Sequence, residues 1–98
     1  MVIEIHQLEG FDPQHRSFNR NAEIHRSEQG LSARFFYEGL RVDTGTHFEV
    51  AQVMTDLAER LHKSGFTQIR SRVNFKGSRY LAERQPWIDY PDPVARSR

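Results

Sequence analysis

Residues 50–76 read VAQVMTDLAERLHKSGFTQIRSRVNFK, and the spacing of the apolar residues changes once within this stretch. From Thr67 to Lys76 apolar and polar residues alternate, which is the period of a strand with one buried side. In the first part, apolar residues instead recur at the spacing of one helix face. The residues of this stripe are Val50, Val53, Met54, Leu57, Ala58 and Leu61. The stretch therefore predicts an amphipathic helix closed by Gly65, followed by a strand.

The start of the helix is predicted from the residues just before this stretch. Thr46 and Glu49 have the spacing of a capping box, in which Thr46 is the N-cap and the Glu49 side chain reaches back to it. On this interpretation the helix runs from His47 to Lys63. Thr46 and Glu49 are thus expected to have a structural role.

The tripeptide Asp43-Thr44-Gly45 resembles the motif around which aspartic proteases build their active site. Such an enzyme needs the Asp in a rigid loop between strands, where it shares one proton with a second Asp. Here Arg41 interrupts the apolar approach to the tripeptide, and an amphipathic helix follows it. We interpret the tripeptide as a polar turn before the helix, since a motif counts only in its expected context.

Further strands are predicted on both sides of the central stretch. Upstream, runs of β-branched and aromatic residues are separated by turn residues, and downstream Gly77-Ser78 is a two-residue turn signal. The fold class is therefore α+β: an antiparallel sheet of four to five strands in the order β-β-β-α-β-β, with one long amphipathic helix packed on one face. The other face must meet water, the tail or a partner. The upstream and final strands are expected at residues 2–8, 22–26, 31–37 with 40–42, and 79–82.

Length and composition indicate one small domain. The chain has 98 residues, of which 37% are apolar and 28% are charged, as in ordinary folded proteins. We expect a single α+β domain over residues 1–85. Residues 86–98 are expected to form an extended tail of proline and aromatic residues, whose last residues fray.

The sequence favours a cytoplasmic protein. It contains no cysteine, which excludes disulfides and thiolate metal sites. The first residues lack the basic and apolar segments of a signal peptide, and no apolar run is long enough to span a membrane.

No catalytic residue, metal site or cofactor is predicted. The five histidines are His6, His15, His25, His47 and His62, and none of them is spaced to form a local metal-binding pair. There is no nucleophile elbow and no glycine-rich nucleotide loop. An enzyme whose polar site is assembled from distant residues remains the third hypothesis.

A basic strand is the first candidate binding surface. Residues 63–98 carry eight Lys or Arg against three acidic residues. Arg70, Arg72 and Lys76 share the polar face of the predicted strand, and Arg79 and Tyr80 follow across the turn. Basic side chains beside exposed aromatic rings can bind single-stranded RNA or DNA through phosphates and stacked bases. This is the second hypothesis for function.

The tail is the second candidate surface. Trp87 and Tyr90 lie between prolines that favour an extended chain. The tail can dock into a partner, cover the open face of its own sheet, or cover a neighbouring copy in a homodimer. Our first hypothesis is therefore a small non-catalytic domain that associates with another protein or with itself, without a membrane partner.

Overall fold

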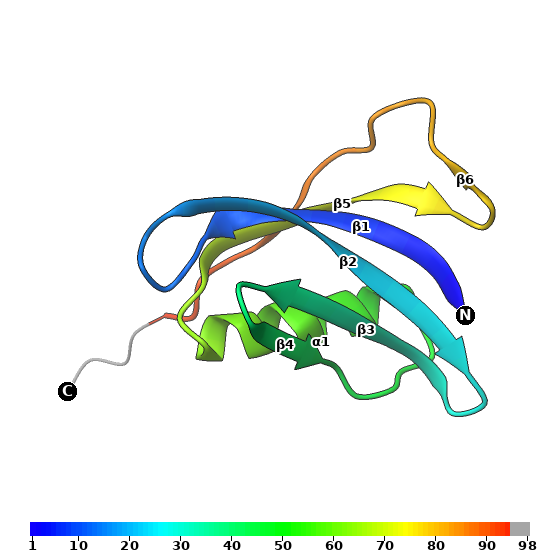
Figure 1. Cartoon of the computed structure of the whole chain (residues 1–98), viewed down its shortest axis with the longest axis horizontal. Coiled ribbons are helices and arrows are strands. Elements are labelled where there is room, and N and C mark those ends of the chain that lie inside the picture. The colour runs from blue at the N-terminus through cyan, green and yellow to red at the C-terminus, as the bar shows by residue number, and fades with distance from the viewer. Residues whose placement is uncertain (95–98) are drawn as a thin grey trace.

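The computed structural model describes residues 1–94 (Figure 1). Within them the chain forms a seven-stranded antiparallel sheet and one helix of 14 residues. The α+β class is confirmed, but the predicted sheet has too few strands and the predicted helix is too long. The expected fraying of the last residues lies outside the described residues. The elements are β1 (Val2–Phe11), β2 (Ser17–Ser27), β3 (Gly30–Tyr37), β4 (Leu40–Asp43), α1 (Val50–Lys63), β5 (Thr67–Lys76), β6 (Arg79–Tyr80) and β7 (Ile88–Tyr90).

The strands follow one another in the order β4-β3-β2-β1-β5-β6, and β7 also pairs with β5. β1 is central, because it pairs with both β2 and β5. α1 lies under one face of the curved sheet and carries the chain from β4, at one edge, back to β5 (Figure 1). Within residues 1–94, the opposite, outer face of the sheet is not covered by a helix.

The sheet has two strands more than the five in the predicted order, and each has a local cause. Glu38 and Gly39 both have positive φ, of 47° and 86°, so the chain turns tightly and residues 31–42 form two strands. Residues 88–90 pair with β5 because the tail returns along the outside of that strand. Sequence periodicity gave no signal for a strand of this length.

The apolar stripe of α1 packs into the core as predicted. Val53, Leu57 and Leu61 are fully buried. Phe66 folds back after Gly65, whose φ is +100°, and its N–H donates to Leu61 O at 3.0 Å. This is the Schellman ending that the sequence predicts. Edge-to-face contacts then join four aromatic residues in the core: Phe18, Phe35, Tyr37 and Phe66.

The predicted start of the helix is wrong. The N-cap is Glu49, whose N–H donates to Gln52 Oε1 at 3.1 Å in a capping box. Thr46 lies outside the helix, because the residues around it are held at the edge of β3. Thr44 Oγ1 accepts a hydrogen bond from the Ala33 N–H at 2.8 Å, and His47 exchanges backbone hydrogen bonds with Leu31.

Candidate functional site

The two predicted binding surfaces lie side by side on the outer face of the sheet. The pairing of β5 with β7 sets Arg70 opposite Asp89 and Ile69 opposite Tyr90. The tail therefore runs along the basic strand (Figure 1). The name tail surface is used below for the side chains that meet there: Arg70, Arg72, Trp87 and Asp89. Tyr90 lies on the opposite side, where it packs against the core beside Ser71.

Trp87 is the centre of the tail surface. The guanidinium carbons of Arg70 and Arg72 lie 4.5 and 4.2 Å from the centre of its ring. Such cation–π contacts are worth about 0.5–1 kcal/mol each at exposed sites. Among residues 1–94, Trp87 makes these contacts with Arg70 and Arg72 and not with Lys76 or Arg79.

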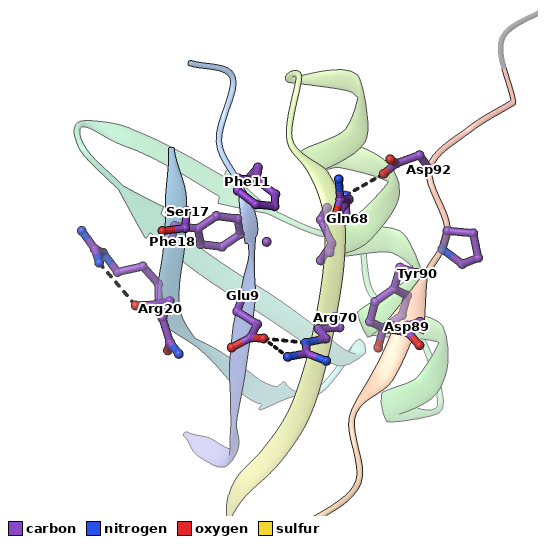
Figure 2. A pocket seen from close by; sticks show the side chains of 14 residues that line it. Glu9, Phe11, Ser17, Phe18, Arg20, Gln68, Arg70, Asp89, Tyr90 and Asp92 are labelled. Carbon is purple, nitrogen blue, oxygen red and sulfur yellow. Dashed lines mark hydrogen bonds and ion pairs between the residues drawn. The ribbon is translucent and has the colours of Figure 1, made fainter. Parts of the chain in front are cut away.

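The two arginines of the tail surface have different partners. Arg70 forms an ion pair with Glu9, which faces it from β1 (Figure 2), and lies opposite Asp89 on β7. Arg72 donates to the amide oxygen of Gln7 at 3.0 Å and, within residues 1–94, has no carboxylate partner. The charge of Arg70 is therefore balanced inside the chain, whereas that of Arg72 is not.

The tail is also anchored by Tyr90 and Asp92. The Tyr90 hydroxyl lies 2.9 Å from Ser71 Oγ, and burial raises the pKa of Tyr90. Asp92 accepts a hydrogen bond from the Gln68 N–H at 2.7 Å (Figure 2). Gln68 has a φ of +53°, which is unfavourable for a residue with a side chain. This backbone conformation turns its N–H towards the tail.

The remaining predicted residues lie on the β5–β6 hairpin. Lys76, Arg79 and Tyr80 are exposed, and the Tyr80 ring packs against Phe75 with centres 5.1 Å apart. Arg84 follows on the exposed segment after β6. None of these three cations has a carboxylate partner within residues 1–94. The hairpin is therefore a small cationic projection beside the tail surface.

A pocket of about 800 Å³ opens next to the tail surface, between β1, β2, β5 and β7 (Figure 2). Glu9, Asp89 and Asp92 contribute carboxylates to its wall, and Arg20 and Arg70 contribute guanidiniums. This mixed lining has no preference for one sign of charge. Glu9 is held by Arg70, so it is not a free base.

The Asp-Thr-Gly stretch lies at the end of β4. Asp43 is paired with Arg41 at 2.8 Å and with Arg34 at 3.3 Å. Burial of Asp43 acts to raise its pKa, but the hydrogen bonds from these two arginines outweigh it and the pKa is lowered. Asp43 is thus an ionised partner of arginines at the edge of the sheet.

Two carboxylates have structural contacts with distant residues that the sequence did not indicate. Asp56 accepts hydrogen bonds from His47 Nε2 at 2.8 Å and from the Gly45 N–H at 3.0 Å, so it joins α1 to residues 44–47. Asp12 accepts a hydrogen bond from the Tyr37 hydroxyl at 2.7 Å. The dipeptide Asp12-Pro13 indicated a turn, but nothing local indicated a distant tyrosine.

The described residues offer neither a metal centre nor a membrane span. Within residues 1–94, no three His, Asp or Glu side chains gather where they could hold a metal ion. In the same range, no helix has the length and apolar character needed to cross a membrane. Compared with models of protein families, with curated proteins and with solved structures, the chain matches none.

Proposed function

We propose that this chain is a non-catalytic association domain that binds another protein chain, in the first place a second copy of itself. The observation that carries the proposal is the exposure of large apolar side chains on a small domain. Phe48 is 90% exposed and Tyr80 is 69% exposed. Phe36 and Ile88 are also more than half exposed, at 57% and 56%. Aromatic side chains of this kind are enriched in protein interfaces.

The ionisable groups support association over catalysis. A general acid or base works best with a pKa near the operating pH. The pKa values of Asp12, Asp43 and Asp56 are instead lowered, away from neutrality. In each case burial acts in the opposite direction and hydrogen bonds outweigh it, which is the pattern of carboxylates that hold a structure together.

Sedimentation equilibrium of the full chain tests this proposal. We expect the average mass to rise towards twice the monomer mass between about 1 μM and about 1 mM, the range of weak to moderate dimers. A mass that stays at the monomer value over this range would contradict self-association. Monomer behaviour together with binding to RNA would favour the second candidate.

Single-stranded RNA or DNA binding is that second candidate. It is supported by Arg72, Lys76, Arg79 and Arg84, which lack carboxylate partners within residues 1–94, and by the exposed Tyr80 ring beside them. Phosphates would contact the cations, and a base would stack on the aromatic ring. Arg70 contributes less to this candidate, because Glu9 already neutralises it.

Fluorescence anisotropy with a labelled single-stranded RNA tests the second candidate. About four phosphate contacts should weaken binding by about 50-fold between roughly 50 and 200 mM salt. Lys76→Ala/Arg79→Ala should reduce this salt dependence, whereas Arg26→Ala/Lys63→Ala, which removes two exposed cations elsewhere on the chain, serves as the matched control. Absence of binding at the lower salt concentration rules the candidate out.

A further inference from the structure

The sheet ends at β4, and within residues 1–94 one side of this strand has no neighbouring strand. The Thr44 N–H donates to Ala33 O of β3 at 3.1 Å, so the Thr44 backbone faces β3. Backbone groups alternate in direction along a strand, which turns the N–H and C=O groups of Arg41 and Asp43 away from β3. These two residues therefore present a short open edge.

The side chains beside this edge form a row of alternating charge. The pairing of β2, β3 and β4 sets Glu23 opposite Arg34, and Arg34 opposite Asp43. The row thus runs acid, base, acid and reaches the open edge at Asp43, which Arg41 of the same strand also contacts at 2.8 Å. A cation in the next position across the edge would continue it favourably.

We propose that β4 of a second copy of this chain completes the edge, in an antiparallel dimer with its two-fold axis at Val42. This inference names the surface used in the self-association proposed above and rests on that proposal. Antiparallel pairing about Val42 sets Arg41 of each copy opposite Asp43 of the other. The row of charges then continues across the interface from Asp43 of one copy to Arg41 of the second.

Backbone direction and charge together select this register. The N–H and C=O groups of Arg41 and Asp43 that face away from β3 must meet such groups of the second β4 strand. Two-fold axes placed at Arg41, at Val42 or at Asp43 satisfy this condition. An axis at Arg41 sets two guanidiniums opposite each other, and an axis at Asp43 sets two carboxylates opposite each other. Like charges in these positions are unfavourable. Of the three axes, the one at Val42 pairs opposite charges twice.

The other edge of the sheet is less suited to a symmetric pairing. β7 lies there, with Asp89 as its middle residue. A two-fold axis at Asp89 sets two carboxylates opposite each other, which opposes pairing. This register of β7 is therefore opposed by charge, whereas the register of β4 about Val42 is favoured.

Charge reversal in the full chain tests the register. Arg41→Asp and Asp43→Arg each place like charges opposite each other twice, and each should raise the dimer Kd by about tenfold or more in sedimentation equilibrium. The double variant Arg41→Asp/Asp43→Arg restores opposite charges across the interface, so its Kd should fall below that of either single variant. It should stay above that of the wild type, because position 43 then carries an arginine opposite Arg34. Because the exchange also restores the ion pair between residues 41 and 43 within each copy, an unchanged circular dichroism spectrum of each single variant is needed to exclude a defect in folding.

A backbone variant and a control complete the experiment. Arg41→Pro removes an N–H that faces away from β3, so it should block dimer formation while the circular dichroism spectrum of the monomer is kept. Arg79→Asp makes the same change of charge on β6, at the other end of the sheet. Its Kd should equal that of the wild type.

The two negative results have different meanings. A wild-type chain that stays monomeric at all concentrations contradicts self-association and this dimer with it. A wild-type dimer whose Kd is unchanged in Arg41→Asp, Asp43→Arg and Arg41→Pro contradicts pairing through β4 and leaves self-association through another surface.

Discussion

Asp12 shows how one carboxylate organises the loop between β1 and β2. It accepts hydrogen bonds from the backbone N–H groups of Gln14 and Arg16 at 2.9 Å, from Arg16 Nε at 2.8 Å, and from the Tyr37 hydroxyl at 2.7 Å. Burial alone would raise the pKa of Asp12, but these hydrogen bonds lower it to about 2. They stabilise the ionised form more than burial disfavours it.

The stability of the fold should therefore decrease in acid. A carboxylate whose pKa is lower in the folded state stabilises that state above its unfolded pKa, near 3.8, and loses this effect as the pH falls towards about 2. We expect the Tm measured by circular dichroism to fall as the pH is lowered through this window. Asp43 and Asp56, whose pKa values are also lowered, should add to the decrease.

Asp12→Asn isolates the contribution of this one group. The variant should lower the Tm at neutral pH by roughly 10 °C, because the amide cannot replace the charged acceptor. Its Tm should also change less than that of the wild type between about pH 5 and pH 2. Glu38→Gln removes an exposed partner of Arg16 and serves as the control with little effect. An equal acid dependence in Asp12→Asn and wild type would contradict this role of Asp12.

The segment that precedes α1 belongs to the sheet as much as to the helix. Asp56 holds it from the helix side through His47 and the Gly45 N–H. On the sheet side, Thr44 Oγ1 accepts the Ala33 N–H. The helix begins after this segment because its backbone is already paired.

Thr44→Ala and Thr46→Ala should therefore differ. Loss of the Thr44 hydroxyl leaves the Ala33 N–H without its acceptor and should lower the free energy of unfolding by about 1 kcal/mol. Thr46→Ala should change it by less than about 0.5 kcal/mol, because Thr46 is not a cap. Urea denaturation of the two variants measures both values. Equal decreases in the free energy of unfolding in the two variants would contradict the assignment of the N-cap to Glu49 and would favour Thr46.

The tail is an element held by a few specific contacts. Its strand β7 is short, so the contacts of Trp87, Tyr90 and Asp92 supplement three pairs with β5. Trp87 is the single tryptophan of the chain. Its fluorescence therefore reports the docking of the tail directly.

Removal of an anchor should release the tail. Asp92→Ala deletes the acceptor of the Gln68 N–H and should make Trp87 easier to quench with acrylamide. Glu83→Ala, on the exposed segment after β6, is the matched control. Equal quenching in Asp92→Ala and wild type would mean that Asp92 does not hold the tail.

At the scale of the whole molecule, folding brings some of the basic residues near the C-terminal end into contact with acidic residues from earlier in the chain. Arg70, from the basic residues 63–98, pairs with Glu9, from residues 1–62, which carry ten acidic residues against six arginines. Lys76, Arg79 and Arg84 keep exposed side chains on and after the β5–β6 hairpin. The hairpin projects from the sheet, at the end opposite the β1–β2 loop (Figure 1). The cationic end and the open β4 edge are thus separate surfaces.

Salt should distinguish a β4 dimer from an apolar one. Two ion pairs between copies are screened by salt, so the dimer Kd should rise when salt is raised from about 50 mM to about 500 mM. Sedimentation equilibrium at the two concentrations measures this change. A Kd that falls or stays constant would indicate an interface made mainly of apolar side chains such as Phe48.

The amino-acid sequence by itself determined the features that depend on neighbouring residues. The helical stripe ending at Leu61, the turn at Gly65 and the alternation that begins at Thr67 all arise from contacts within a few positions. These features were sufficient to predict the α+β class, the helix end and the position of β5. They also placed Arg70 and Arg72 on one face of β5.

The tertiary structure decided the features that depend on residues far apart in the chain. Arg70 and Glu9 are 61 positions apart, and Asp12 and Tyr37 are 25 positions apart. The tail joins the sheet through the pairing of β7 with β5 and through the contacts of Trp87 with Arg70 and Arg72, and no local pattern indicated that these segments meet. Thr46 is not a cap because β3 already holds the chain beside it. Periodicity records which side of an element is apolar, whereas the partner of each polar group is set by the pairing of distant strands.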